Sequence, residues 1–451
     1  MGLTLGAIER ELVAAEALST IETGSSERET LKLLSDKYKI SDPRIRGTIH
    51  SIVFETIHHL NAIDFLINRA LQKGNLDKLQ PRLRNLLRVG VYNLKFTQNS
   101  PQKTTKILVN LVKRQFGESI AKFVNAIMRK VEYFELKELI AALSEYKKLA
   151  LLYNHPVWFV KYLINLIGRS DAISVMETTL EENFIYIRIN PLTSDLETVM
   201  TKLSEEKYEF ITDDALPDII RLTQWKIPIV HSSLYENGAV YLQDKASALV
   251  SHVLNPQEGE TILDICAAPG GKSMHIGQKM HNTGMVISVD RSSRRLTELS
   301  TKLTPYNLLN VFILNAIGEE SSTFLRVKAD KILIDPPCSG TGTFISRPYA
   351  KWKINPKIIR RMADIQWTLL ESAVSILKPQ GKIVYSTCSV TIEENEELIK
   401  RFLRKHIDFS LVPSDPMIGS PGLLGLHDAQ RLWPHLHNTE GFFIATLERK
   451  L

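Results

Sequence analysis

The chain has 451 residues, of which 44% are hydrophobic and 24% charged, a composition typical of a folded cytosolic protein. No stretch approaches the roughly 18 apolar residues that a membrane span needs, and Glu9, Arg10 and Glu11 interrupt the apolar core that a signal peptide requires. We therefore predict a soluble, cytoplasmic protein of two to four domains, at roughly 100–200 residues per domain.

The net charge of +6 is unevenly distributed along the chain. Residues 1–135 contain 21 Lys and Arg against 14 Asp and Glu, so they carry +7 and the remainder carries −1. A basic module joined to a nearly neutral one indicates a surface for nucleic acid. A basic helical domain without that role is the alternative.

The N-terminal third has helical periodicity. Residues 5–145 contain amphipathic stretches such as "AIERELVAAEALSTI" and "AKFVNAIMRKVEYF", and Pro81 stands where a helix first turn accepts proline. A further helix is predicted over residues 155–168, ended by Gly168. These patterns predict a bundle of helices.

Between residues 180 and 235 the pattern changes to a small α+β insert. "FIYIRIN", "YEFITDD" and "DIIRLT" have the features of strands, and "SDLETVMTKLSEE" those of a helix. We predict three domains: residues 1–145, residues 146–235 (ferredoxin-like or RRM-like) and residues 236–451.

The third predicted domain alternates between strands and helices. After the helical segment "YLQDKASALVSHVL", the predicted strands are "TILDIC", "GMVISVD", "NVFILN", "KILIDPP" and "GKIVYSTC". Alternating βαβα predicts an α/β fold with a parallel sheet covered on both faces. Ligands bind such sheets at the carboxyl ends of the strands, near the switch point of the strand order.

A glycine loop, "ILDICAAPGGKS" at residues 262–273, follows the first of these strands. It is not a phosphate loop, because that motif requires glycine where Cys266 stands, and GxGxxG is also absent. Asp264 and Asp290 end two strands, and a carboxylate in the place of Asp290 suits ribose hydroxyls, although strand-end acids also serve as caps. A nucleoside cofactor without phosphates, S-adenosylmethionine, fits this pattern.

The three cysteines of the chain, Cys266, Cys338 and Cys388, all follow predicted strands. Their low, odd number argues against a disulfide framework, and without a CxxC pair no metal site is predicted. Any one of them could be core packing, but three at strand ends predict a shared cleft. There Asp335 and the thiols suit attack on cytosine: a thiolate added to carbon 6 makes carbon 5 nucleophilic, and a carboxylate supplies a proton at nitrogen 3.

The activation of Cys388 is predicted from the residues that follow it. Thr391 and Glu394 have the spacing of a capping box, which predicts a helix starting near Thr391. The dipole of that helix would favour the thiolate of Cys388.

The motifs "DICAAPGGK", "DPPCSGTG" and "YSTCS", in this order, closely resemble the Sun/Fmu-type RNA cytosine-C5 methyltransferases. "PRLRNLLRVGVYNLKF" and "AKFVNAIMRK" resemble the NusB-like RNA-binding domain of the bacterial 16S rRNA members. The resemblance covers nearly the whole chain. It implies a Rossmann-like methyltransferase domain acting on RNA, with rRNA favoured over tRNA, and a soluble monomer. The alternative from another class is a non-catalytic RNA-binding or ribosome-assembly factor.

The resemblance also implies roles for single residues. Cys388 would be the nucleophile, Cys338 would assist product release, and Asp335 would contact both the base and the cofactor. In DNA cytosine methyltransferases the cysteine of a Pro-Cys motif attacks, which would instead favour Cys338. Asn315 stands where the family usually has an aspartate near the adenine. The implied cofactor-binding residues are Cys266, Ala267, Ala268, Pro269, Gly270, Gly271, Lys272, Asp290, Asn315 and Asp335.

Overall fold

The computed structural model describes residues 7–72, 74–181 and 184–450, so the start of the predicted helical region and residues 182–183 of the predicted insert lie outside the described residues. The chain divides into two compact units. Unit 1 is Met1–Glu181 with Arg347–Lys353, and unit 2 is Glu182–Ser346 with Ile354–Leu451. In the described residues, no helix is long and apolar enough to cross a membrane.

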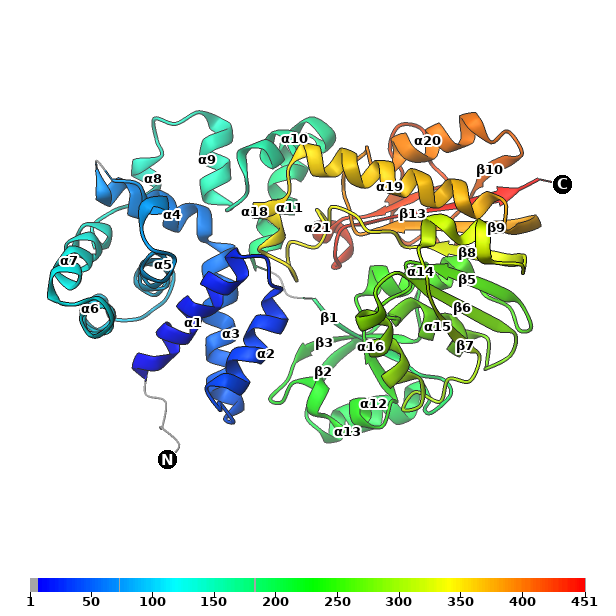
Figure 1. Ribbon diagram of the computed structural model, residues 1–451, viewed down its shortest axis with the longest axis horizontal. Helices are drawn as coiled ribbons and strands as arrows, with labels where there is room; N and C mark the ends of the chain where they lie inside the picture. The colour runs from blue at the N-terminus through cyan, green and yellow to red at the C-terminus, as the bar shows by residue number, and fades with distance from the viewer. Residues whose placement is uncertain (1–6, 73, 182–183, 451) are drawn as a thin grey trace. The chain divides into compact units, whose positions relative to one another are not determined.

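Unit 1 is helical, as predicted, and Figure 1 draws its N-terminal helices in blue to cyan. Pro81 occupies the first turn of its helix, and Gly168, at φ +83°, ends another, both as the sequence predicts. The helices are α1 (Ala7–Glu22), α2 (Glu27–Lys37), α3 (Pro43–His58), α4 (Leu60–Leu71), η1 (Leu76–Lys78), α5 (Pro81–Lys95), α6 (Pro101–Phe116), α7 (Glu118–Glu132), α8 (Leu136–Leu139), α9 (Glu145–Leu152), α10 (Val157–Ile167), α11 (Arg169–Glu181) and α18 (Ala350–Lys353).

The core of unit 1 forms around α5. Leu86, Leu87 and Val91 of this helix are fully buried, and they pack with apolar residues of α4, α6 and α7. Val89 joins a second cluster with residues of α1 and α3. A helix that buries more than one face lies inside a bundle and not on its surface.

The last helix of unit 1, α18, comes from a distant part of the sequence, within the range 236–451 that we assigned to the third domain. Lys351 Nζ donates to the carbonyl of His58 at 3.2 Å, and Trp352 Nε1 donates to that of Ile57 at 3.1 Å. The division therefore differs from the predicted domains, because unit 1 includes this segment and extends past residue 145 to Glu181.

We expect Lys351→Met to stabilise the protein more at pH 6 than at pH 9. Lys351 is 1% exposed, and burial lowers its pKa to about 7, opposed only in part by the charge of Glu55. Above pH 7 the folded protein has released a proton that the unfolded chain still holds, so wild-type stability rises with pH, by about 2 kcal/mol between pH 7 and pH 9. Methionine has no proton to exchange.

Denaturant unfolding of both proteins at pH 6 and pH 9 measures this difference. Lys353→Met is the matched control, because the exposed Lys353 lies two residues away and its Nζ also donates to a carbonyl, that of Ile21 at 3.4 Å. A stability difference between wild type and Lys351→Met that does not change with pH would contradict the prediction.

Unit 2 begins with a four-stranded antiparallel sheet in the order β2-β3-β1-β4. Its first three strands and its main helix match the predicted insert, but its fourth strand lies beyond residue 235, in the segment "YLQD" that we predicted to start a helix. That helix starts at Lys245, capped by Asp244. The elements are β1 (Ile185–Ile189), α12 (Leu196–Glu205), β2 (Glu209–Thr212), β3 (Ile219–Gln224), η2 (Ile229–His231), α13 (Ser233–Glu236), β4 (Val240–Leu242) and α14 (Lys245–Leu254).

The rest of unit 2 is an α/β domain, which confirms the predicted fold class. All five predicted strands are present, as β5 to β9. The elements are β5 (Thr261–Ile265), α15 (Gly271–Lys279), β6 (Met285–Asp290), α16 (Ser293–Leu303), β7 (Val311–Asn315), η3 (Gly318–Glu320), α17 (Ser321–Phe324), β8 (Ala329–Ile334), α19 (Pro356–Val374), β9 (Leu377–Thr387), α20 (Glu396–Lys405), β10 (Phe409–Val412), β11 (Ser420–Pro421), β12 (Gln430–Leu432), α21 (Pro434–His437) and β13 (Phe442–Arg449).

The large sheet has the order β11-β12-β13-β9-β8-β5-β6-β7, with β10 also paired to β13. Strands β5 to β9 are parallel, and β13 runs antiparallel to β9. Because β6 and β7 extend the sheet on one side of β5 and β8 and β9 on the other, the switch point lies between β5 and β8.

Neighbouring residues of each central strand pack on opposite faces of this sheet. Ile262 belongs to one core cluster, with residues of α14, α15 and α16, and Leu263 belongs to another, with residues of α19 and α20. Figure 1 shows these two groups of helices on the two sides of the sheet. Both faces are thus covered, as the predicted parallel sheet requires.

Candidate active site

The predicted site residues follow the carboxyl ends of neighbouring parallel strands. Cys266 follows β5 and Asp290 ends β6, while Asp335 directly follows β8 and Cys388 directly follows β9. Because β8 pairs with both β5 and β9, and β6 with β5, these ends lie along one edge of the sheet, beside the switch point.

The glycine loop is shaped by backbone that only a few residues adopt. Cys266 has φ +69° and Gly270 has φ +98°. A Cβ atom on Gly270 would lie 2.2 Å from Leu299 Cδ1, so a larger residue would be strained and would also clash. Ala267 and Ala268 are buried and Pro269 is exposed, while Gly271 begins α15.

Asp290 holds this loop against the sheet. Its Oδ2 accepts from the Ala268 amide at 3.1 Å and its Oδ1 from the Ser292 amide at 2.8 Å. Asn315 Nδ2 donates to the Asp290 carbonyl at 2.9 Å, so it supports the same strand end. Direct contact of Asp290 and Asn315 with a cofactor stays a prediction.

A carboxylate–lysine pair lies at the centre of the edge. Lys272 Nζ donates to Asp335 Oδ2 at 2.7 Å, and Ser386 Oγ donates to Asp335 Oδ1 at 3.1 Å. Burial acts to lower the pKa of Lys272, but Asp335 and Cys388 outweigh it and the pKa is raised. Lys272 is therefore a cation near Cys388.

The expectation that Cys338 and Cys388 meet is confirmed, since their sulfur atoms lie 3.1 Å apart. We call these two residues the cysteine pair. The hydrogen bond to Cys388, burial and the negative charges of Glu394 and Asp335 raise the pKa of the Cys338 thiol. Cys338 is thus held as a thiol, next to a second sulfur that has Lys272 nearby.

Cys266 packs differently from the cysteine pair, and one cleft for all three cysteines stays a prediction. Cys266 packs against the α19–α20 core cluster and Cys388 against the α14–α16 cluster, on the other face of the sheet. Burial also raises the pKa of Cys266 far above its ordinary value, which disfavours a thiolate there.

The predicted capping box at Thr391 is also wrong. Helix α20 starts at Glu396, eight residues after Cys388, and Thr391 Oγ1 instead donates to Glu394 Oε2 at 2.7 Å. The dipole of α20 therefore cannot activate Cys388 as we predicted, because it acts only within the first turn. A neighbouring cation also favours a thiolate, and Lys272 is a cation near Cys388.

The turns that carry the cysteine pair are fixed by two glycines that sequence reasoning missed. Gly342 N donates to the carbonyl of Cys388 at 3.0 Å, and Gly441 N donates to that of Gly342 at 2.8 Å. A Cβ atom on Gly342 would lie 2.0 Å from the Gly441 oxygen. The adjacent Glu440 is buried, which raises its pKa to about 8, and its Oε2 has no hydrogen-bond partner among the residues that the structure describes. No sequence signal marked these residues, because their neighbours are distant in the chain.

The edge also fits S-adenosylmethionine chemically. Asp264 is buried and accepts from Ser273 Oγ at 2.5 Å, but its Oδ1 has no partner in the described residues. An unpartnered buried acceptor suits the hydroxyl or ammonium donors of the cofactor, and burial raises the pKa of Asp264 to about 7. The carboxylates of Asp290 and Asp335 likewise suit a ligand with ribose hydroxyls and positive charge.

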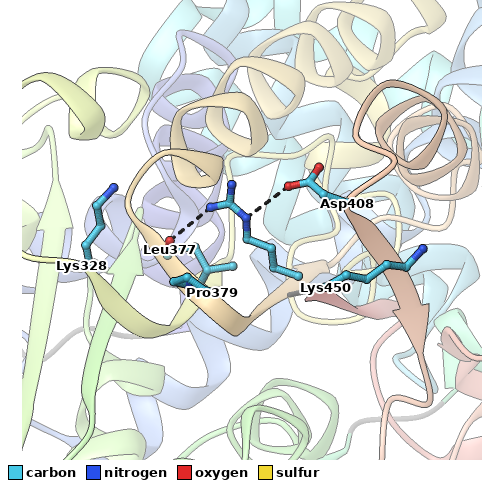
Figure 2. A pocket seen from close by; sticks show the side chains of 6 residues that line it. Lys328, Leu377, Pro379, Asp408 and Lys450 are labelled. Atoms are coloured by element: carbon cyan, nitrogen blue, oxygen red, sulfur yellow. Dashed lines mark hydrogen bonds and ion pairs between the residues drawn. The ribbon is translucent and has the colours of Figure 1, made fainter.

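Two other features of unit 2 lie apart from the cysteine pair. Figure 2 shows a cavity of about 420 Å³ near the amino end of β9, where Arg449 pairs with Asp408. Asp218, His252 and His275 have the ligand types of a metal site, but both imidazole Nε2 atoms are hydrogen-bonded to Asp218, at 2.8 and 2.9 Å. We interpret this cluster as a structural contact between the loop before β3 and helices α14 and α15.

Comparison with known proteins finds three family models along the chain. The family model described as 16S rRNA methyltransferase RsmB/F matches residues 251–448, that of the NusB family matches residues 9–133, and the ferredoxin-like domain of RsmF/B-like methyltransferases matches residues 155–228. The chain is 29% identical to the probable ribosomal RNA small subunit methyltransferase B of Bacillus subtilis (strain 168), over 97% of this chain and 98% of that one.

Several solved structures resemble most of the chain, among them two from Pyrococcus horikoshii. One is the methyltransferase homolog protein from Pyrococcus horikoshii, with 30% identity and a TM-score of 0.62, covering 68% of this chain and all of that one. The other is NSun6 from Pyrococcus horikoshii with SFG, with 26% identity and a TM-score of 0.61, covering 65% of this chain and 98% of that one.

The glycine loop and the carboxylates at the switch point, together with these matches, define an S-adenosylmethionine-dependent methyltransferase. Three family models, which together match most of the chain, belong to one architecture: a NusB region, a ferredoxin-like domain and a methyltransferase domain. The chain carries an RsmB/F-type methyltransferase domain, and curated relatives that match nearly its whole length are named ribosomal RNA small subunit methyltransferase B.

Proposed function

We propose that this protein transfers a methyl group to carbon 5 of a cytosine in small-subunit ribosomal RNA, through a covalent bond between Cys388 and carbon 6 of the base. S-adenosylmethionine, when bound by the glycine loop, Asp290 and Asp335, supplies the methyl group. The observation that carries the proposal is the cysteine pair, whose sulfur atoms lie 3.1 Å apart at the edge that also holds the Asp335–Lys272 pair.

The chemistry needs a thiolate, a proton source and a base. The Cys388 thiolate forms a bond to carbon 6, and Asp335 takes a proton from water and passes it to nitrogen 3, so the electron pair of the carbon 5–carbon 6 double bond becomes available at carbon 5. Once Cys388 is bonded to carbon 6, its hydrogen bond and charge no longer raise the pKa of Cys338, so Cys338 releases its thiol proton to water. After carbon 5 has gained the methyl group, the Cys338 thiolate takes the proton from carbon 5. The double bond re-forms, nitrogen 3 returns its proton to Asp335, and the Cys388 thiolate is expelled.

The assignment of the two sulfur roles follows from their surroundings. Cys338 is held as a thiol by its hydrogen bond to Cys388, by burial and by nearby carboxylates. Cys388 has the ammonium of Lys272 nearby, and a neighbouring cation favours a thiolate. We therefore assign attack to Cys388 and proton transfer to Cys338.

An RNA substrate is supported by the basic N-terminal region and by the names of the relatives. Residues 1–135 carry a net charge of +7, which suits contacts to phosphates. The Bacillus subtilis relative is named for the RNA of the small ribosomal subunit. The target cytosine has to leave its base stack before a thiol can reach its carbon 6, so we expect a flipped base or a loop.

The test is methyl transfer by the wild-type protein to RNA with labelled S-adenosylmethionine, followed by bisulfite sequencing to locate the modified cytosine. We expect label at carbon 5 of cytosine in small-subunit ribosomal RNA. RNA with 5-fluorocytidine should give a stable protein–RNA adduct, because fluorine cannot leave as the carbon-5 proton does. Binding of cofactor and RNA without methyl transfer would instead indicate a non-catalytic factor.

A further inference from the structure

Three consecutive polar side chains after the Cys388 turn are completely buried. Glu394, Asn395 and Glu396 are each 0% exposed. Acidic residues are almost never fully buried without partners, because removing a carboxylate from water is costly. Their partners therefore indicate what the burial achieves.

Glu394 accepts hydrogen bonds from the turns of both cysteines. Its Oε2 accepts from Ser339 Oγ at 2.5 Å and from Ser389 Oγ at 2.7 Å. Ser339 directly follows Cys338, and Ser389 directly follows Cys388. One carboxylate oxygen thus joins the residues next to the two sulfurs, although these residues are 50 positions apart in the chain.

Further donors complete the shell around the same carboxylate. Oε1 accepts from the Ser339 amide at 2.7 Å and from Gln366 Nε2 at 3.0 Å, and Oε2 also accepts from Thr391 Oγ1 at 2.7 Å. Five donors thus converge on the two oxygens of this one side chain. Hydrogen bonds to an ionised acceptor are stronger than neutral ones.

Asn395 fixes the Cys388 turn from its two sides. It occupies the N-cap position of α20, where asparagine ordinarily accepts from the first-turn amides, yet it makes no such bond. Its Oδ1 accepts from Thr387 Oγ1 at 2.6 Å and its Nδ2 donates to the Ser389 carbonyl at 2.8 Å. The side chain is used on the residues before and after Cys388 in place of its own helix.

We propose that Glu394 is a positioning residue that, with Asn395, holds Cys338 and Cys388 at the separation their chemistry requires. The effect of this positioning on methyl transfer rests on the proposed function. Glu394 has a second effect on the pair, because its negative charge is one of the causes that raise the pKa of Cys338. It therefore favours the thiol form of Cys338.

The spacing of the cysteine pair can be measured without any RNA. Diamide oxidises two neighbouring thiols to a disulfide and is itself reduced to the hydrazine. We expect wild-type protein to form the Cys338–Cys388 disulfide rapidly, as quantified by mass spectrometry of its peptides, and Glu394→Ala to form it at least about tenfold more slowly, because its turns are no longer joined. A wild-type rate in folded Glu394→Ala would overturn the inference.

The kinetic arm compares Glu394→Gln with wild type. The glutamine side chain has an NH₂ group where the carboxylate has an oxygen, and this donor faces groups that also donate. We therefore expect kcat for methyl transfer to fall about 100-fold, the effect of displacing a catalytic group by about 1 Å. The KM for RNA should change little, and the affinity for S-adenosylmethionine, measured by calorimetry, should be unchanged. Equal loss in kcat and in cofactor affinity would indicate general unfolding of the site and would contradict positioning.

Glu371→Gln is the matched control. Glu371 also accepts two hydrogen bonds in unit 2, from Lys405 and His406, but these join α19 to α20 and not the cysteine turns. It should keep wild-type disulfide and methyl-transfer rates. If wild-type protein forms the disulfide but never an RNA adduct, the proposed function is wrong. The disulfide rates of wild type and Glu394→Ala would still show whether Glu394 holds the two sulfur atoms close together.

A milder variant covers the case in which changes at Glu394 prevent folding. Ser339→Ala removes one hydroxyl donor and leaves the carboxylate with its other partners. We expect it to slow both disulfide formation and kcat by several-fold, and Ser389→Ala to act in the same direction. Wild-type rates in both serine variants would overturn the inference.

Discussion

Cys388→Ala is expected to abolish covalent attachment to RNA and to reduce methyl transfer by at least about 10³-fold. Carbon 5 of cytosine is too weak a nucleophile unless a thiolate has first added to carbon 6. Without the Cys388 sulfur this addition does not occur, so methyl transfer is blocked and not merely slowed. Cys338 does not replace that sulfur, because burial and the negative charges of Glu394 and Asp335 still raise the pKa of its thiol when the hydrogen bond to Cys388 is gone.

The measurement is a denaturing gel of protein incubated with 5-fluorocytidine RNA and S-adenosylmethionine. Cys266→Ala serves as the comparison, since Cys266 packs on the other face of the sheet and should not affect which sulfur attacks. The adduct should persist in Cys266→Ala, even if the altered loop binds the cofactor less tightly. An adduct of undiminished yield in Cys388→Ala would refute the assignment.

The sheet could be predicted because its strands are short apolar runs bounded by turn residues. Strands β5, β6 and β7 lie within the predicted segments, and β8 and β9 overlap theirs but begin earlier, at Ala329 and Leu377. Parallel strands bring the residues after their carboxyl ends to one edge, so the meeting of Cys338 and Cys388 followed from topology alone. No information on side-chain contacts was needed for it.

The orientation of Cys266 could not be predicted in the same way. It stands directly after β5, and successive residues of a strand point to opposite faces, so a shift of one position changes the face. Its φ of +69° departs from strand geometry, and no pattern in the sequence announces that change. Cys388, which follows β9, packs on the opposite face.

The role of Glu394 was hidden by a local pattern that points elsewhere. In "TIEENEEL" the spacing of Thr391 and Glu394 is that of a capping box, and a run of acidic residues predicts an exposed helix start. The partners that bury Glu394 come from distant positions, such as Ser339 and Gln366. Because their contacts are tertiary, they override the local preference, and the helix starts later.

The three predicted domains and the two observed units differ for a similar reason. The segment Arg347–Lys353 packs with helices of unit 1, although it lies between two parts of unit 2 in the sequence. Two of its hydrogen bonds go to carbonyls 293 and 295 residues earlier, those of His58 and Ile57. Composition and periodicity describe neighbours along the chain, so they carry no signal for such a contact.

Cys338→Ala is expected to give the opposite phenotype to Cys388→Ala: a protein–RNA adduct that forms on ordinary RNA and accumulates. The attacking sulfur is still present, but the group that takes the carbon-5 proton is missing, so elimination is slow. Removal of a general base ordinarily costs about 10²- to 10⁴-fold in rate. Turnover should therefore fall into that range, while the first methyl transfer remains fast.

A single-turnover experiment separates these steps, with the first methyl transfer measured as label in the adduct and release measured as free methylated RNA. The double variant, lacking both sulfurs, should form no adduct, because accumulation requires the attack by Cys388. Since the sulfurs lie only 3.1 Å apart, geometry alone does not distinguish them, and the distinction depends on protonation. If Cys338→Ala loses the adduct and Cys388→Ala accumulates it, the roles of the two cysteines are exchanged. That result would also contradict the prediction that Lys272, which is near Cys388, makes Cys388 the thiolate.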